Sequence, residues 1–263
     1  MKIDGRAIAN HILDNLQTHV SALKERGITP TLAVIQIGDD PGSNAYIRQK
    51  QKSAEQIGAK LILCHVSSIT YQAELQKLIQ KYNDDPSVHG IIVQRPLPKN
   101  LHAEQIRLSK DVDGFLPDSP YPVPVVSAVL TILGDRINSK KIAVIGRGET
   151  AGKPIADALI KRGYDLSIIH SQTPNPEEII KTADIVISCV GRRHVVRRHN
   201  IKKGAILISV GLSRDSEGKL HGDYEEEEIK DVARLYTPTP GGVGPINVAC
   251  LMVNLVKAAN SLL

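Results

Sequence analysis

A phenol and an amine lie four residues apart in the first third of the chain, at Tyr46 and Lys50. Residues at i and i+4 share one face of a helix, so the two side chains would be neighbours. A phenol and an amine side by side can transfer protons to and from a bound substrate. The alternative is a solvated basic face, because Arg48 and Lys52 lie in the same segment.

Two further polar groups stand where predicted elements end. Gln94 closes the apolar run 89–94, and Asp111 and Asp113 precede a proline-rich segment. Parallel α/β sheets bind their ligands at the carboxyl ends of strands, so Gln94 is placed to contact one. Gln94 could equally be a strand-end hydrogen-bonding group, and paired aspartates often only form turns. Three such clusters at the ends of successive elements favour a ligand site.

A glycine-rich turn follows the apolar run 141–146 and contains Gly146, Gly148 and Gly152. A strand, a glycine turn and a helix in this order present backbone N–H groups to a pyrophosphate. The spacing is one residue longer than the commonest dinucleotide motif, and a tight turn that binds nothing is the alternative.

The end of the next predicted strand bears on the choice of dinucleotide. An acidic residue there binds the ribose hydroxyls of NAD, whereas this chain has residues 170–173, without a carboxylate. The hydroxyl of Ser171 and the guanidinium of Arg147 would instead suit a 2′-phosphate, which favours NADP over NAD.

Hydrophobic periodicity places these groups on two series of alternating helices and strands. The first series has helices near 8–27, 43–58 and 71–83, with Ser43 or Asn44 as the expected N-cap of the second, and strands at 31–38, 60–66 and 89–94. After the prolines of segment 114–124, a helix near 125–134 leads to strands at 141–146, 166–170, 185–190 and 205–210 and a last helix at 246–263. Continuous apolar runs suit strands covered on both faces. The predicted fold is α/β with two lobes.

Composition narrows the class of protein. The 263 residues are 41% hydrophobic and 23% charged, which excludes disorder as the main state, and a net charge of +5 favours anionic ligands. The chain has no Trp and one Phe, against stacking on single-stranded nucleic acid. Three cysteines fit neither a disulfide framework nor a cysteine-rich metal site, and the nine histidines lack metal-ligand spacing with carboxylates, so no metal is expected.

Neither nucleic acid nor a membrane is expected as a partner. The basic run 192–199 is offset by the glutamates of 225–228, and we interpret it as a solvated loop near the cofactor phosphates rather than a nucleic-acid surface. No apolar run approaches the length of a membrane span, and the N-terminus has no apolar leader, so a soluble protein of a reducing compartment is expected.

Taken together, the motifs resemble the bifunctional methylenetetrahydrofolate dehydrogenase/methenyltetrahydrofolate cyclohydrolase family. The resemblance runs through nearly the whole chain, in the family's order, at segments 3–5, 38–52, 90–98, 110–114, 144–147, 170–173 and 240–245. It implies NADP-dependent oxidation of 5,10-methylenetetrahydrofolate, followed by hydrolysis of the methenyl product to 10-formyltetrahydrofolate, within one-carbon metabolism and purine biosynthesis.

The same resemblance implies roles for individual residues. Lys50 would be the central catalytic residue, with Gln94 positioning its amine, Tyr46 packing on the folate and Asp113 holding the pterin. Arg147 and Ser171 would bind the 2′-phosphate of NADP. The remaining implied contacts are to cofactor from Gly146, Gly148, Gly152, Lys153, Thr173, Gly241 and Gly242, and to substrate from Pro240.

The resemblance also implies how the chain is divided. Residues 1–118 and 246–263 would form the folate-binding catalytic domain, with the last helix packed back on it, and residues 119–245 the Rossmann-type NADP-binding domain. A cytoplasmic homodimer is expected.

Four departures from the family pattern leave alternatives open. Segment 121–128 lacks a usual Thr and Gly, Ser209 stands for a usual Asp, 246–247 replace a Met-Thr pair, and Arg95 replaces an apolar residue. Arg95 could point inward, lowering the pKa of Lys50 or meeting a substrate carboxylate, or outward as a surface charge. A dehydrogenase without hydrolase activity, an enzyme acting on a small carboxylic acid, and a non-catalytic NADP- or folate-binding sensor are the competing hypotheses.

Overall fold

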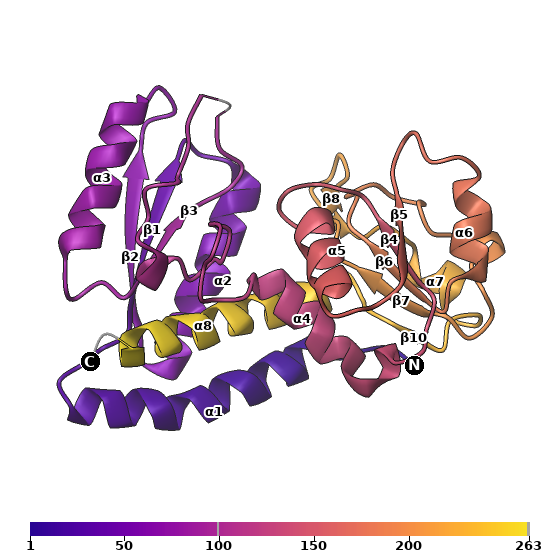
Figure 1. The fold of residues 1–263 in the computed structure, drawn as a ribbon, viewed down its shortest axis with the longest axis horizontal. Helices are drawn as coiled ribbons and strands as arrows, with labels where there is room; N and C mark the ends of the chain where they lie inside the picture. The colour runs from indigo at the N-terminus through magenta and orange to yellow at the C-terminus, as the bar shows by residue number, and fades with distance from the viewer. Residues whose placement is uncertain (99, 262–263) are drawn as a thin grey trace. The chain divides into compact units, whose positions relative to one another are not determined.

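The chain folds into two compact α/β units, each built on a parallel sheet (Figure 1). The computed structural model describes residues 1–98 and 100–261. The three-stranded unit comprises Ala9–Pro124 and Val248–Leu263, and the five-stranded unit comprises Met1–Ile8 and Val125–Asn247. The predicted division put residues 1–8 with the first sheet. They belong with the second, because Lys2 pairs with Tyr236 and Ile3 N–H donates to the Tyr236 carbonyl at 2.9 Å.

The three-stranded unit has the parallel order β2-β1-β3. Its strands are β1 (Thr31–Ile37), β2 (Lys60–Val66) and β3 (Gly90–Val93), and helices α2 (Pro41–Ile57) and α3 (Gln72–Asp84) connect them. The 3-10 turn η1 (Leu108–Lys110) follows β3. Helices α1 (Gly5–Glu25) and α8 (Val243–Ser261) each contribute most of their length to this unit.

Both faces of this sheet are covered, which explains why β1 is apolar without alternation. Side chains of a strand alternate between faces. Leu32 and Val34 pack with apolar residues of α1, α2 and α8, whereas Ala33 and Ile35 pack with Leu75 of α3 and its neighbours. The last helix therefore does pack on the first sheet, as predicted.

Helix α8 is long and apolar enough to cross a membrane by length and composition, although the sequence was expected to hold no such run. In the structure 67% of its most apolar window is buried. Residues such as Met252 and Leu255 are completely enclosed in the core of the three-stranded unit. Burial against the sheet accounts for its composition.

The five-stranded unit has the parallel order β10-β7-β6-β4-β5. Its strands are β4 (Ile142–Ile145), β5 (Leu166–Ile169), β6 (Ile185–Ser188), β7 (Ile206–Ser209) and β10 (Leu235–Tyr236), and a hairpin of β8 (Ser213–Arg214) and β9 (Leu220–His221) stands apart. The helices are α4 (Pro124–Leu133), α5 (Gly152–Lys161), α6 (Pro176–Thr182) and α7 (Glu226–Ile229), with 3-10 turns η2 (Gly134–Ile137) and η3 (Arg198–Asn200).

These two sheets confirm the predicted α/β fold, with corrections at element ends. Helix α2 begins at Pro41 and is capped by Asp40, whose carboxylate accepts the Ser43 N–H at 2.7 Å, so neither Ser43 nor Asn44 is the cap. Helix α8 begins at Val243, earlier than expected, and the predicted residues 262–263 lie outside the described part of the chain. Short elements such as α6, α7 and the hairpin were not predicted, because segments of two to seven residues carry little periodicity.

Candidate active site

Helix α2 places Lys50 on its buried face. Its buried residues are spaced by three or four, which is the stripe of an amphipathic helix: Ser43, Ile47, Lys50, Ala54 and Ile57. The side chains of Arg48 and Lys52 are exposed, so the solvated basic face is real for these two residues but excludes Lys50. Lys50 is only 8% exposed.

The buried ammonium of Lys50 has one side-chain hydrogen-bond partner among the described residues, Gln94. Lys50 Nζ donates to Gln94 Oε1 at 2.9 Å. Gln94 follows β3 directly, and its backbone N–H donates to the Ile35 carbonyl at 2.8 Å, which continues the strand pairing. Its Nε2 donates to the Arg95 carbonyl at 2.9 Å. Both ends of the amide are therefore fixed, and the oxygen is held toward Lys50.

Burial sets the protonation of the groups around Lys50. It lowers the pKa of Lys50, and the nearby Asp113 carboxylate opposes that shift. It raises the pKa of Tyr46, which lies one turn before Lys50 and so remains a phenol at neutral pH. Burial also raises the pKa of Asp113, while Lys50 and Arg95 act in the opposite direction. The site thus combines an amine of reduced basicity, a phenol and a carboxyl group.

The two neighbouring aspartates have different surroundings. Asp111 is buried and accepts the Leu116 N–H at 3.0 Å. It therefore forms a turn, which was one of the two alternatives for this pair of aspartates. Asp113 is close enough to Lys50 for their charges to interact. Asn254 of α8 ties this segment down by donating to the carbonyls of Val112 and Pro122, each at 2.9 Å. Sequence reasoning missed Asn254, because it is distant in sequence and no motif marks it.

Arg95 lies beside this cluster rather than away from it. Its guanidinium carbon is 4.9 Å from the centroid of the Phe115 ring, a cation–π arrangement. Its charge lowers the pKa of Asp113. The lowered pKa of Lys50 is due to burial. Of the alternatives left open for Arg95, an effect on the pKa of Lys50 is therefore not seen, and its charge acts on Asp113 instead.

The segment that departs from the family pattern, 121–128, is well anchored. Tyr121 is buried, and its hydroxyl donates to the Ser109 carbonyl at 3.0 Å. Helix α4 starts three residues later, at Pro124. The missing Thr and Gly therefore coincide with an ordered tyrosine contact and the start of a helix.

The glycine turn of the five-stranded unit joins β4 to α5. Gly146 has φ +99°, which favours glycine, and Gly152 starts α5. A Cβ on Gly152 would overlap the Gly146 carbonyl oxygen and lie 2.7 Å from its carbon, so the helix can approach the turn only with glycine at this position. This close approach of helix and strand is the geometry in which a dinucleotide pyrophosphate binds.

The other predicted cofactor residues surround this turn. The side chain of Arg147 is exposed, as is that of Ser171, which follows the neighbouring strand β5. Thr173 Oγ1 accepts the His170 N–H at 2.9 Å and so shapes the turn. Lys153 forms an exposed ion pair with Asp157 at 2.8 Å. The turn between β10 and α8 holds Pro240, Gly241 and Gly242, and the Gly5 backbone packs against the last two.

Fold and site together define a class: a two-unit α/β enzyme that binds a dinucleotide on one sheet and carries a buried lysine on the other. Residues 122–263 match the tetrahydrofolate dehydrogenase/cyclohydrolase NAD(P)-binding domain, and residues 3–113 match the catalytic domain of the same family. The chain therefore belongs to the tetrahydrofolate dehydrogenase/cyclohydrolase family.

Individual relatives are similar to this chain over nearly its full length. The bifunctional protein FolD of Lactococcus lactis subsp. cremoris is 40% identical over 98% of this chain and 96% of its own length. The FolD of Halalkalibacterium halodurans is 40% identical over 98% of both chains. The crystal structure of Campylobacter jejuni FolD, a methylenetetrahydrofolate dehydrogenase/cyclohydrolase, superposes with a TM-score of 0.95 at 35% identity, covering 100% of this chain and 99% of that one.

Membership confirms the family inferred from the motifs and the two activities expected from it. The chain is an enzyme of tetrahydrofolate one-carbon metabolism, with dehydrogenase and cyclohydrolase activities and a nicotinamide dinucleotide cofactor. Within residues 1–98 and 100–261, no group of three or more His, Cys, Asp or Glu side chains could hold a metal ion.

Proposed function

We propose that Lys50, Gln94, Tyr46 and Asp113 form the site at which 5,10-methylenetetrahydrofolate is oxidised and the methenyl product hydrolysed to 10-formyltetrahydrofolate. The observation that carries this assignment is the hydrogen bond from the buried Lys50 amine to Gln94. A lysine removed from water and fixed by one neutral amide is available as a neutral amine nearer to neutral pH than an exposed lysine.

The surroundings suggest a role for each side chain. The Lys50 amine would assist the attack of water on the amidinium carbon and carry protons during ring opening. Gln94 is a positioning residue, because its oxygen orients that amine and its nitrogen is fixed by a backbone carbonyl. Tyr46, a phenol on the same helix face, would pack on the folate, and the Asp113 carboxylate would bind the exocyclic amine and ring N–H of the pterin.

We further propose NADP as the cofactor of the five-stranded unit. The cradle formed by Gly146, Gly148 and Gly152 fits a pyrophosphate, and the exposed Arg147 and Ser171 at the ends of β4 and β5 suit a 2′-phosphate. The Trypanosoma brucei FolD, 31% identical with a TM-score of 0.93 over 99% of this chain and 97% of that one, was solved with NADP and an inhibitor. When bound, the nicotinamide accepts the hydride. Lys153, Thr173, Gly241, Gly242 and, for substrate, Pro240 remain proposed contacts.

Turnover of 5,10-methylenetetrahydrofolate with NADP tests the proposed function directly. NADPH, the methenyl compound and 10-formyltetrahydrofolate are followed together, and formation of NADPH with 10-formyl product is the expected result. Accumulation of the methenyl compound would mean a dehydrogenase without hydrolase activity. Binding of NADP without any turnover would favour the sensor hypothesis instead.

Arg147 is expected to distinguish NADP from NAD. Replacing Arg147 by Ala removes a charge that we assign to the 2′-phosphate, a group that NAD lacks. We expect binding of NADP to weaken by about tenfold and binding of NAD to change little, as for one charge-assisted contact. Titration of the variant with both dinucleotides measures the difference. Equal losses for NADP and NAD would contradict this assignment.

The charge of Arg95 is expected to determine the pH below which kcat/KM for the folate substrate falls. The Arg95→Leu variant removes a positive charge that lowers the pKa of Asp113, so that pKa rises. Protonated Asp113 binds the pterin less well, and the acid limb of the pH profile of kcat/KM should therefore move to higher pH by about one unit. The Arg95→Lys variant keeps the charge and should keep the limb near its original position. A shift of the same size in both variants would exclude charge as the cause.

We also propose a cytoplasmic homodimer. The family resemblance supports the dimer, and free thiols at Cys64, Cys189 and Cys250 suit a reducing compartment. Sedimentation of the purified protein would measure the oligomeric state.

A further inference from the structure

Asp223 is a completely buried carboxylate that organises a loop distant from it in sequence. One carboxylate oxygen accepts the Arg192 N–H at 2.8 Å, and the other accepts the Val190 N–H at 3.1 Å. The Asp223 carbonyl accepts the N–H groups of Val195 and Val196 at 3.0 and 3.1 Å. A single residue thus holds both ends of residues 190–196.

Asp223 is itself held by a hydrogen bond to the sheet. Its N–H donates at 2.9 Å to the hydroxyl of Ser209, the last residue of β7. The Ser209 N–H in turn donates to Thr237 Oγ1 at 2.9 Å. Ser209, a departure from the family pattern in the sequence, therefore supports the backbone of Asp223. The buried Asp223 carboxylate is hydrogen-bonded at both oxygens, as burial of such a group requires.

The loop that Asp223 holds lies at the carboxyl end of β6. This strand is adjacent to β4, whose carboxyl end carries the glycine turn, and β5 is on the other side of β4. In parallel sheets of this kind, ligands bind outside the carboxyl ends of the strands. The 2′-phosphate belongs at the β5 side, so the β6 side faces the pyrophosphate and the half of the dinucleotide beyond it.

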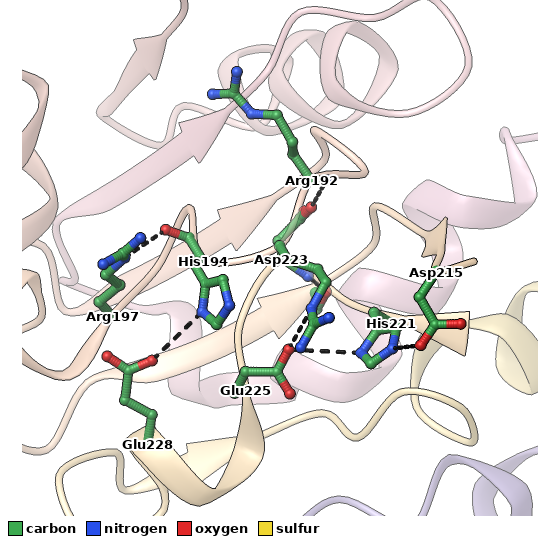
Figure 2. A network of polar contacts seen from close by, with 10 residues as sticks. Arg192, His194, Arg197, Asp215, His221, Asp223, Glu225 and Glu228 are labelled. Atoms are coloured by element: carbon green, nitrogen blue, oxygen red, sulfur yellow. Dashed lines mark hydrogen bonds and ion pairs between the residues drawn. The ribbon is translucent and has the colours of Figure 1, made fainter. Parts of the chain in front are cut away.

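Two consecutive arginines in the loop differ in their partners. Arg193 Nε donates to Glu225 at 2.8 Å. Glu225 and the nearby Glu228 form an acidic group that also contacts His221 and His194. Figure 2 shows the Arg192 guanidinium directed away from this group, while the Arg192 backbone remains bound to Asp223. Within the described part of the chain, the exposed Arg192 side chain makes no ion pair or hydrogen bond.

We propose that Arg192 binds the pyrophosphate of the dinucleotide and that Asp223 is the positioning residue that presents it. This inference rests on the proposed NADP cofactor and adds to it a cation outside the glycine turn. The Asp223 carboxylate binds the loop through backbone N–H groups, so the guanidinium of Arg192 stays available for an anion. Arg193 is neutralised by Glu225 and serves the loop only structurally.

The two arginines provide a matched test. Arg192→Ala and Arg193→Ala are each titrated with NADP, NAD and adenosine 2′-monophosphate, which has the 2′-phosphate but neither phosphate of the pyrophosphate. Arg192→Ala should weaken NADP and NAD alike, by about tenfold, and leave binding of adenosine 2′-monophosphate unchanged. Arg193→Ala should leave all three dissociation constants near those of the wild type. Unchanged binding of NADP by Arg192→Ala, or an equal loss for adenosine 2′-monophosphate, would overturn the proposal.

Asp223→Asn tests the positioning role. The two N–H groups bind different carboxylate oxygens, and Asn replaces one of these oxygens by an NH2 group that cannot accept, so one of the two bonds is lost. We expect Asp223→Asn to weaken NADP binding by about tenfold. Adding Arg192→Ala should cause no further loss, because both changes remove the same contact. Ser209→Ala removes the bond to the Asp223 N–H but leaves both carboxylate bonds, so it should weaken NADP binding less than Asp223→Asn does.

The outcomes separate this proposal from the proposed cofactor. A wild-type protein that binds neither dinucleotide would overturn both. Wild-type binding of NADP with additive losses in the double variant would overturn only the role of Asp223. If Asp223→Asn does not fold, the pair of arginine variants still decides whether Arg192 contacts the pyrophosphate.

Discussion

Replacing Lys50 by Met is expected to reduce hydrolysis of methenyltetrahydrofolate by about 1000-fold, within the range for loss of a general acid–base group. Methionine has similar length and is tolerated at a buried position, but it has no proton to transfer. The dissociation constant for NADP should not change, because Lys50 and the glycine turn belong to different units of the chain. Hydrolysis is measured by the decay of isolated methenyltetrahydrofolate, and cofactor binding by titration.

The same helix provides the control for Lys50. Lys52 lies two residues further along α2 with an exposed side chain, so Lys52→Met removes the same charge without reaching the buried site. It should hydrolyse the substrate at close to the wild-type rate. Hydrolysis by Lys50→Met at a near wild-type rate would show that the amine has no part in the reaction. Equal losses in both variants would mean that net charge, rather than the buried amine, matters.

Gln94 illustrates how much of the site could be predicted from the sequence. It ends an apolar run and Lys50 lies on a predicted helix, so each was a candidate from its local pattern. Their hydrogen bond joins residues 44 positions apart, and only the pairing of β3 with β1 and the packing of α2 bring them together. The resemblance to a family supplied this pairing before the structure did, because local patterns contain no information on long-range contacts.

Asp111 and Asp113 show the opposite limit. The sequence presents two carboxylates two residues apart, and nothing in their spacing separates a turn-forming group from one that faces a lysine. Burial and the hydrogen bond to Leu116 make the distinction for Asp111. Asp223 was not a candidate at all, because its partners are backbone N–H groups, which every sequence provides. Side chains that bind backbone have no complementary residue for a motif to reveal.

Replacing Gly152 by Ala is expected to abolish most dinucleotide binding, with a loss of about 100-fold for NADP and NAD alike. The added Cβ would overlap the carbonyl oxygen of Gly146 and lie 3.2 Å from the Arg147 nitrogen. These are backbone atoms that cannot rotate away, so α5 must move from the turn. Loss of one or two backbone hydrogen bonds to the charged pyrophosphate is enough for a loss of about 100-fold in affinity. The overlap should also destabilise the free protein by about 1–3 kcal/mol.

Gly148→Ala is the control for the steric overlap, because a Cβ on Gly148 would meet no atom within 4 Å. This variant should melt at the wild-type temperature without cofactor, whereas Gly152→Ala should melt lower. Hydrolysis of isolated methenyltetrahydrofolate by Gly152→Ala should persist below its melting temperature, since Lys50 and Gln94 lie in the other unit. Retained NADP affinity in Gly152→Ala would contradict the cradle at this turn. Loss of hydrolysis together with oxidation, in a protein that is still folded, would show that the two units depend on each other more than their separate cores suggest.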